Sequence, residues 1–461
     1  MNNERFLVIG GVAAGMSAAS RFRRNKPEAE VTVIQNGEYV SYGSCGLPYF
    51  ISGLVKDVHG LVVYDAEFFK KKRNINILSW HEATKIDPAA KVVLARDLKE
   101  GREIKLSYDK LAICTGASPF KPAIPGNELK NIFVIRTAED GVILRNFIEK
   151  EAPQKAAIIG AGPIGMEMTE ALSVRGIEVT VIKRPGSILR MFDDDMVAKV
   201  EEELKGKNVN LIKNAIIQGF EGDKEGKVRT VVLADTRYDV DFILLATGSK
   251  PNSRLAREAG LKVNADETIA VDERMQTSNP DIFAAGDCVG QKDLLTGKEV
   301  YFPRGTTANK QGRIAGENAS GGNEAFEGIT GTLVSKIFDL TVARTGLSSQ
   351  EAAAAGYDFV TSTISHPDHA FTYPDPAPEN ITTKLIMDRK TGRLLGAQMI
   401  GKHKNMGVAK RIDVFATALQ NKMTVDEINR LDLAYSPPYS PFYDNILIAA
   451  EVGLRKLSRG T

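Results

Sequence analysis

The stretch AAIIGAGPIGMEM, residues 156–168, decides the fold. An apolar run of strand type leads into Gly160, Gly162 and Gly165, and the chain then continues with helix-forming residues. Glycines at this spacing allow a tight turn, let a pyrophosphate approach the backbone and let the helix pack close to its strand. The free N–H groups at the start of such a helix suit an anion. The pattern therefore predicts a βα turn that binds a dinucleotide.

A second turn of this kind lies near the N-terminus, in FLVIGGVAAGMSAASRFRR, residues 6–24. It is less regular, because Val12 stands at the middle glycine position and Gln35 stands where an acid ordinarily binds a ribose. A glutamine can still form hydrogen bonds with hydroxyl groups, without the assistance of a charge. The small residues that would form this turn are Gly10, Gly11, Ala13, Ala14 and Gly15.

Short β-rich runs alternate with helical stretches, which indicates an α/β protein with two doubly wound dinucleotide-binding domains. The runs that we expect to be buried parallel strands are Arg5–Ile9, Val31–Gln35, Lys110–Thr115, Ala156–Ile159, Val179–Lys183 and Phe242–Thr247. After residue 328 the pattern changes to a smaller α+β domain, with strands at Thr382–Met387 and Leu394–Met399 around the turn DRKTG. The predicted domains are 1–119 with 254–328, 120–253, and 329–461.

Composition excludes several classes of function. The 461 residues carry a formal net charge of +2, so no field for nucleic acid or for a membrane surface is expected. No apolar run approaches the roughly 18 residues that span a bilayer. Three widely spaced cysteines argue against a disulfide framework and against a structural metal site. We expect a cytoplasmic protein without a metal.

The end of the strand after the second glycine loop carries Lys183 and Arg184, where NAD-binding chains usually carry an acid. Cationic side chains at this place suit a 2′-phosphate, which favours NADPH over NADH. The run FILLATGSKPN, residues 242–252, fits an exit strand of the same domain, and Gly248 follows its apolar part.

Two further segments, LAICTGASPFKP (111–122) and TSNPDIFAAGD (277–287), lead from an apolar strand into glycine. Together with the first glycine loop, they resemble the FAD contacts of the pyridine nucleotide-disulfide oxidoreductase family. The resemblance covers essentially the whole chain. It implies that Thr115, Gly116 and Asp287 bind FAD, that NADPH or NADH binds at the second loop, and that the C-terminal domain forms a homodimer.

Cys45 lies in EYVSYGSCGLPYF, residues 38–50, which in this family passes the flavin ring. Pro48 suits the first turn of a helix beginning near Cys45, and the dipole of such a helix would favour the thiolate. The family's dithiol members carry a second cysteine here, and this chain does not. One thiol must act through a mixed disulfide, a persulfide or a sulfenic acid. This single-cysteine subgroup contains the coenzyme A disulfide reductases, NADH oxidases, NADH peroxidases and persulfide or polysulfide reductases.

Within the subgroup, the chain looks most like the coenzyme A disulfide reductases. Peroxidase and oxidase members carry a histidine at the position of Ala13. The resemblance implies that Tyr373 and Tyr435 reach the other subunit's cysteine, where a tyrosine hydroxyl could protonate a leaving thiolate. It also implies a coenzyme A site with Arg24 as the best phosphate contact. The other residues that we assign to this site are Ser41, near Arg24, and Tyr439.

The expected reaction is the reduction by NAD(P)H of coenzyme A disulfide, or of its persulfide or polysulfide, through FAD and Cys45. Two other hypotheses remain open. One is an NADH oxidase that uses Cys45 as a sulfenate. The other is a flavin-binding redox sensor with little turnover.

Overall fold

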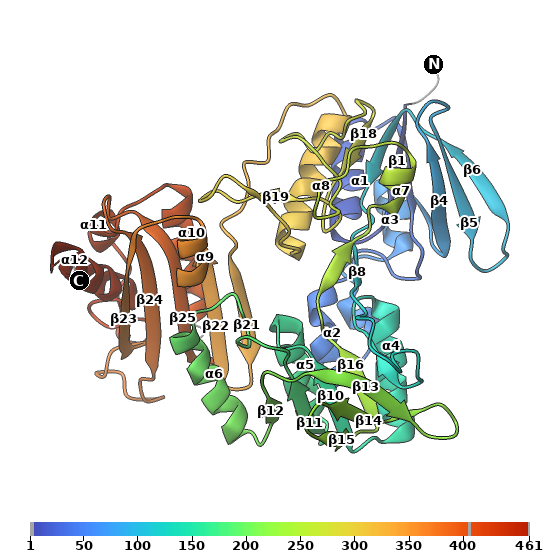
Figure 1. Ribbon diagram of the computed structural model, residues 1–461. Coiled ribbons are helices and arrows are strands. Elements are labelled where there is room, and N and C mark those ends of the chain that lie inside the picture. Colours follow the sequence, from blue (N-terminus) through green and yellow to red (C-terminus); the bar gives the residue numbers. More distant parts are fainter. Residues whose placement is uncertain (1–3, 404–406, 460–461) are drawn as a thin grey trace.

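The structure is a computed structural model that describes residues 4–403 and 407–459. Figure 1 shows three lobes, each built around a sheet of five strands. The first sheet is parallel and has the order β18-β7-β1-β2-β3. Its strands are β1 (Arg5–Ile9), β2 (Glu30–Ile34), β3 (Asn76–Leu78), β7 (Lys110–Ile113) and β18 (Ile282–Ala284).

Two long helices, α1 (Ala13–Asn25) and α8 (Gly305–Ala319), pack against each other beside this sheet. Their backbones come very close, because a Cβ atom at Gly312 or Gly316 would overlap the backbone of α1. The remaining elements of this lobe are α3 (Ala66–Arg73), α7 (Arg254–Glu258) and the antiparallel strands β4 (His81–Asp87), β5 (Val92–Asp97) and β6 (Glu103–Ser107). Three short helices also follow β2 in the chain: η1 (Ser44–Gly46), α2 (Leu47–Ser52) and η2 (Val58–Leu61). Of these, α2 packs against helices of the second lobe (Figure 1).

The second sheet is also parallel, with the order β12-β11-β10-β16-β9. Its strands are β9 (Ile132–Phe133), β10 (Lys155–Ile159), β11 (Glu178–Ile182), β12 (Asn210–Ile212) and β16 (Phe242–Leu245). The helices of this lobe are α4 (Ala138–Glu151), α5 (Pro163–Val174) and α6 (Asp194–Gly206). Smaller strands complete it: β8 (Ala117–Pro119) pairs with β17 (Ser249–Pro251), and β13 (Ile217–Gly222), β14 (Val228–Leu233) and β15 (Arg237–Asp239) form a meander.

The third sheet is antiparallel, with the order β21-β22-β25-β24-β23. Its strands are β21 (Leu333–Ile337), β22 (Leu340–Gly346), β23 (Phe359–Pro367), β24 (Asn380–Asp388) and β25 (Leu394–Lys402). Its helices are α9 (Ser349–Ala354), α10 (Gly407–Gln420), α11 (Val425–Asn429) and α12 (Asn445–Arg459), and the short pair β19 (Gln291–Lys292) and β20 (Glu299–Val300) lies before it in the chain.

Two doubly wound α/β lobes and a C-terminal α+β lobe confirm the predicted fold class. Four predicted strands end one or two residues early, because Gln35, Thr115, Lys183 and Thr247 already belong to the loops at the carboxyl edge of each sheet. Strand β18 joins the first sheet although it follows the whole second sheet in the chain. The exact domain boundaries at residues 119, 253 and 328 remain predictions.

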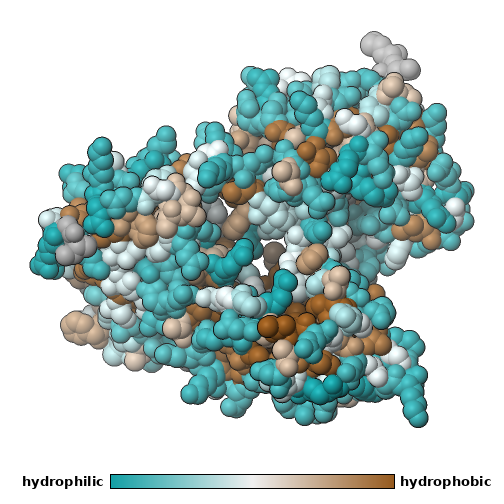
Figure 2. Space-filling model, viewed as in Figure 1, coloured by the Kyte–Doolittle hydropathy of each residue, from teal (hydrophilic) through white to brown (hydrophobic). Residues whose placement is uncertain are grey.

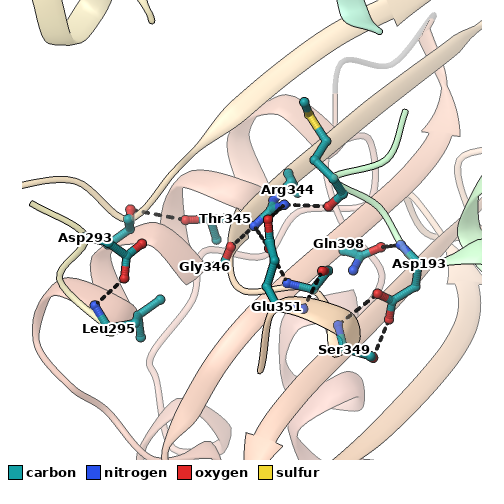
Figure 3. Close-up of polar contacts among 12 residues, drawn as sticks. Asp193, Asp293, Leu295, Arg344, Thr345, Gly346, Ser349, Glu351 and Gln398 are labelled. Atoms are coloured by element: carbon teal, nitrogen blue, oxygen red, sulfur yellow. Dashed lines mark hydrogen bonds and ion pairs between the residues drawn. The ribbon is translucent and has the colours of Figure 1, made fainter. Parts of the chain in front are cut away.

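A polar joint connects the second lobe to the third. We call it the α6 joint, and its residues are Asp193, Asp195, Ser349, Lys384 and Gln398. Buried Asp193 accepts hydrogen bonds from the backbone N–H and the hydroxyl of Ser349 at 2.9 and 2.5 Å (Figure 3). The Lys384 ammonium lies 2.8 Å from Asp193 and 2.7 Å from Asp195. The Gln398 side chain accepts the backbone N–H of Asp193 at 2.9 Å.

Further contacts join the same two lobes. Arg344 donates to the backbone carbonyl of Met191 and lies 2.7 Å from Glu351. At the other side, Ser335 on β21 donates to Glu167 of α5 at 2.6 Å. The edge strand β21 therefore lies beside α5, and the opposite edge strand β23 lies at the far side of the sheet, as Figure 1 shows.

The face of the molecule drawn in Figure 2 is mainly hydrophilic, and apolar side chains gather on the lobe that contains the second sheet. Among the helices of the described residues, none is long and apolar enough to cross a membrane. Those residues also hold no group of three or more histidine, cysteine or acidic side chains that could bind a metal ion.

Candidate active site

A cleft of about 620 Å³ opens at the carboxyl edge of the first sheet. Gly10, Gln35, Thr115 and Gly116 line it, as the sequence predicted for a dinucleotide site. Helix α1 starts at this cleft, and no side chain caps its first N–H groups. Uncapped N–H groups at a helix start suit a pyrophosphate. A cleft of this size with glycine walls therefore fits a dinucleotide such as FAD.

Gln35 has a structural contact that the sequence did not reveal. Its side-chain oxygen accepts the backbone N–H of Gly11 at 2.8 Å, which holds the glycine turn against the end of β2. Its amide nitrogen has only a long contact of 3.4 Å to Asn36. Because this amide lines the cleft, it remains able to donate to a ribose hydroxyl.

Asp287 follows β18 and lies buried beside the same cleft. The Arg136 guanidinium lies 2.5 Å from its carboxylate and lines the cleft itself. Arg136 precedes α4, whose first turn is fixed by a capping box between Thr137 and Asp140. The cap holds the backbone at Arg136, because its N–H donates to Asp140 at 3.0 Å. A cation and an anion thus face each other at the wall of the cleft.

Cys45 is exposed in the short helix η1, next to Ser44, which lines the cleft. The other two cysteines are buried: Cys114 lies at the end of β7, and Cys288 directly follows Asp287. The Cys288 thiol donates to the carbonyl of Ala285 at 3.4 Å. Cys45 is therefore the accessible thiol of this chain.

Four charged groups act on the Cys45 thiol. Desolvation and then the Glu167 and Asp287 carboxylates raise the pKa of Cys45 above its ordinary value, while the guanidinium groups of Arg304 and Arg136 lower it. The net effect is a raised pKa, so the expected helix-dipole activation of Cys45 is wrong. The physical reason is that desolvation and the Glu167 carboxylate outweigh the six-residue helix α2, although this helix does start near the thiol, at Leu47, with Pro48 in its first turn as predicted.

Arg304, Arg136 and Glu167 were missed by the sequence analysis. Arg304 is the N-terminal cap residue of α8, and its Nε atom is buried without a hydrogen-bond partner in the described structure. Glu167 lies on α5, whose start forms the second glycine loop. Nothing in the spacing of these residues connects them to Cys45, because each comes from a different part of the chain.

The second glycine loop has the geometry that its sequence predicted. Gly160 ends β10 with a positive φ of 115°, and Gly162 is the N-terminal cap of α5 without a side-chain cap. Cβ atoms built at Gly162 and Gly248 would meet no atom within 4 Å. The backbone here is therefore open to a ligand, as a dinucleotide needs.

A cluster of three cations follows β11. Desolvation and then the charges of Arg184 and Arg190 lower the pKa of Lys183. The Lys183 ammonium donates to the Arg184 carbonyl at 2.9 Å, which shapes the loop. Arg184 and Arg190 are exposed, and within the described part of the chain neither has an ion-pair partner. Arg190 was not predicted to belong to this cluster, because it lies six residues after Arg184 in the chain.

The C-terminal tyrosines lie in two loops at the far side of the third sheet from α5. Tyr373 lies between β23 and β24, and Tyr435 and Tyr439 lie between α11 and α12. All three are exposed, and the Tyr435 ring meets Phe442 edge to face with centroids 5.3 Å apart. Within one chain, the two loops that carry these tyrosines belong to the third lobe, whereas Cys45 lies in η1, between β2 and α2.

Arg24 lies exposed at the last turn of α1, and desolvation and the charges of Arg21, Arg73 and Arg313 lower its pKa. Ser41 donates its backbone N–H to the Gly11 carbonyl at 2.9 Å, at the other end of the helix. Thirteen residues of helix, about 20 Å, separate the two ends. The expectation that Ser41 lies near Arg24 is therefore wrong, although an extended ligand could contact both.

Comparison with known proteins agrees with this geometry. A family model described as pyridine nucleotide-disulphide oxidoreductase matches residues 4–312, and a model of the family's dimerisation domain matches residues 334–445. This chain belongs to the pyridine nucleotide-disulphide oxidoreductase family. The resemblance predicted from the sequence is confirmed, and the protein is an oxidoreductase that uses FAD and NAD(P)H.

Three relatives of this oxidoreductase match nearly the whole of this chain. A protein named NAD(P)H sulfur oxidoreductase (CoA-dependent) from Pyrococcus abyssi is 38% identical over 97% of both chains. A protein named NADH oxidase from Methanocaldococcus jannaschii is 35% identical over 98% of this chain and 99% of its own. The structure of an NAD-dependent persulfide reductase from A. fulgidus is 42% identical with a TM-score of 0.94, over 99% of this chain and 84% of that one.

Proposed function

We propose that this oxidoreductase reduces a small disulfide or persulfide of coenzyme A, with Cys45 as its redox thiol. The observation that carries the proposal is an exposed thiol beside the FAD cleft, with the chain's other cysteines buried. Bound FAD supplies the electron pair that it takes from NAD(P)H. With coenzyme A disulfide, the net reaction consumes one NAD(P)H and one proton and yields two thiols.

The residues of this chain have distinct proposed roles. The Cys45 thiolate attacks one sulfur of the substrate disulfide, and the bond between the two substrate sulfurs breaks as a mixed disulfide forms on Cys45. Arg304 and Arg136 stabilise the negative sulfur. Tyr373 and Tyr435, from the second subunit of a homodimer, donate a proton or a hydrogen bond to the leaving thiolate. Arg24, Ser41 and Tyr439 bind the extended coenzyme A group.

FAD has a proposed set of contacts in the cleft. Gly10, Gly11, Ala13, Ala14 and Gly15 form the pyrophosphate turn. Gln35 binds the ribose, and Thr115, Gly116 and Asp287 hold the ribityl and flavin end.

We also propose that NADPH is preferred over NADH. Gly160, Gly162, Gly165 and Gly248 surround the dinucleotide, and the cations at Lys183, Arg184 and Arg190 bind its 2′-phosphate. The A. fulgidus relative is described as NAD-dependent, so its name gives no support for a preference for NADPH. The support for NADPH is the cation cluster of this chain.

The decisive experiment is mass spectrometry of the isolated protein under nonreducing conditions, followed by assays of Cys45→Ser. We expect an adduct of coenzyme A mass on Cys45, and we expect the variant to keep flavin reduction by NADPH and to lose disulfide reduction. Full reduction of coenzyme A disulfide by the variant would contradict the proposal.

The second candidate function is an NADH oxidase, which the M. jannaschii relative favours by its name. It predicts an adduct of oxygen alone on Cys45 and rapid oxygen consumption with NADH, without any need for coenzyme A. The oxygen electrode therefore separates the two functions.

A further inference from the structure

The loop that carries Tyr373 has little packing of its own. We call residues 370–379, which join β23 to β24, the Tyr373 loop. Residues 371–377 are all exposed, and the Phe371 side chain is 84% exposed. A loop without a buried apolar side chain in these positions depends on hydrogen bonds for its shape.

The buried side chain of His369 supplies those hydrogen bonds from the base of the loop. Its Nε2 atom lies 3.1 Å from the carbonyl oxygen of Tyr373 and 3.0 Å from that of Pro376. Carbonyl oxygens only accept, so Nε2 carries a hydrogen and donates to both. The imidazole thus holds the backbone of Tyr373 itself and the backbone three residues later.

The other ring nitrogen fixes the orientation of the imidazole. Nδ1 lies 2.7 Å from the Asp368 carboxyl group, and because Nε2 already carries a hydrogen, this contact needs a further proton, on Nδ1 or on Asp368. The same carboxyl oxygen accepts the backbone N–H of Glu379 at 3.1 Å. His369 and Asp368 are each about 4% exposed. A carboxylate that orients one nitrogen of a buried imidazole directs the other nitrogen at a fixed target.

A buried arginine ties the second tyrosine loop to the first. Arg411 on α10 pairs with Asp444 at 2.7 Å and donates to the carbonyl oxygens of Asp368 and Tyr439 at 2.9 and 3.3 Å. The backbone N–H of Ala370 also donates to the Pro437 carbonyl at 3.1 Å. The base of the Tyr373 loop and the loop of Tyr435 and Tyr439 therefore form one hydrogen-bonded unit.

We propose that His369 is the positioning residue of this unit: its imidazole sets the Tyr373 loop in the conformation that presents Tyr373 to the partner subunit's Cys45. This inference rests on the proposed function, in which Tyr373 serves the thiol chemistry. His369 itself touches neither the substrate nor the thiol, and it acts through the Tyr373 backbone.

Two substitutions test the contacts of the two ring nitrogens of His369 separately. In His369→Gln the side-chain amide reaches the place of Nε2 and keeps a donor for the Tyr373 carbonyl. In His369→Asn the shorter amide keeps only the contact with Asp368. Tyr373→Phe serves as the reference for loss of the hydroxyl, and Thr372→Ala is an exposed control on the same loop.

The measurements on the holoenzyme are flavin reduction by NADPH, thiol release from coenzyme A disulfide, and amide hydrogen exchange of residues 370–379. We expect unchanged flavin reduction in the two His369 variants and in Thr372→Ala. We expect His369→Asn to slow thiol release about 100-fold or more, the loss that we also expect for Tyr373→Phe, and to speed exchange in the loop. His369→Gln should restore both readouts to within about threefold of the wild type.

The outcomes distinguish the two proposals. Wild-type exchange of the loop in His369→Asn would overturn the positioning role. Faster exchange in His369→Asn with a wild-type rate of thiol release in both His369→Asn and Tyr373→Phe would support the positioning of the loop and overturn the proposed role of Tyr373.

Discussion

At the scale of single residues, the charges around Cys45 determine how much thiolate is present. The charge of the Glu167 carboxylate destabilises the thiolate, and the charges of the Arg304 and Arg136 guanidinium groups stabilise it. The thiolate is the reactive form of cysteine. Because the net pKa is raised, Cys45 needs a higher pH than an ordinary cysteine to ionise in the free protein.

Removal of the Glu167 charge is expected to lower the pKa of Cys45. A neighbouring anion disfavours the thiolate, so Glu167→Gln increases the thiolate fraction at a fixed pH below that pKa. The rate of Cys45 alkylation by iodoacetamide against pH measures this, and its midpoint should move to lower pH. Arg304→Met should move it to higher pH. The control is Glu170→Gln, on the same helix, whose carboxylate pairs with Lys336; an unmoved midpoint in Glu167→Gln contradicts the charge assignment.

The cation cluster after β11 gives a second residue-scale prediction. Arg184→Ala together with Arg190→Ala should raise the KM for NADPH, because each contact with a phosphate is charge-assisted. We expect a rise of roughly 10- to 100-fold for NADPH and little change for NADH. Steady-state kinetics with both coenzymes measure the ratio, and Lys199→Ala on α6 is the exposed control. An equal effect on NADH would refute the 2′-phosphate site.

At the scale of elements, the two βα turns perform the same task with different residues. The turn after β10 has all three glycines, and the turn after β1 has Val12 in place of the middle one. In the second turn, a Cβ atom at Gly165 would overlap the Gly160 carbonyl, whereas one at Gly162 would meet open space. Gly165 is therefore needed for packing of α5 on its strand, and Gly162 for approach of the ligand.

This difference predicts opposite phenotypes for two matched substitutions. Gly165→Ala should lower the thermal midpoint, because the helix must move away from the strand. Gly162→Ala should keep the midpoint and weaken NADPH binding about tenfold, since its methyl group occupies the ligand's approach. Differential scanning calorimetry and titration of NADPH under anaerobic conditions measure the two effects. A large loss of stability in Gly162→Ala would contradict this division of roles.

At the scale of the whole molecule, the α6 joint fixes the nucleotide lobe on the dimerisation lobe. The joint adds buried charge to an apolar core that the two lobes share, and Asp193 and Lys384 are each less than 10% exposed. It starts three residues after Arg190. The loop proposed to bind the 2′-phosphate is thus anchored, at its far end, to the lobe that carries the tyrosine loops.

Lys384→Met should be strongly destabilising, because it leaves the Asp193 carboxylate buried without its cation. The expected loss is about 3–5 kcal/mol, the usual cost of breaking one side of a buried pair. The double variant with Asp193→Asn should recover part of it. Chemical denaturation of the holoenzyme measures the change in the free energy of unfolding. The control is Lys410→Met, which removes an exposed ion pair on α10 and should change that free energy by no more than about 0.5 kcal/mol. A neutral Lys384→Met would show that water reaches this joint.

The sequence by itself determined the α/β architecture, because strand runs, glycine spacing and helix starts are local signals. The two turns at Gly10 and Gly160 and the thiol at Cys45 were found for the same reason. Their chemistry depends on residue type and close neighbours in the chain, and the strand ends were misjudged by at most three residues, at β25.

Only the tertiary structure decided which distant charges surround the thiol. Arg136, Glu167 and Arg304 come from three elements, and no spacing in the chain brings them together. The same holds for the joint at Asp193 and Lys384, and for His369 beneath Tyr373. The raised pKa of Cys45 followed from desolvation and a facing carboxylate, which a local helix-dipole argument does not include. Local patterns encode elements, whereas electrostatics and burial arise from packing between elements.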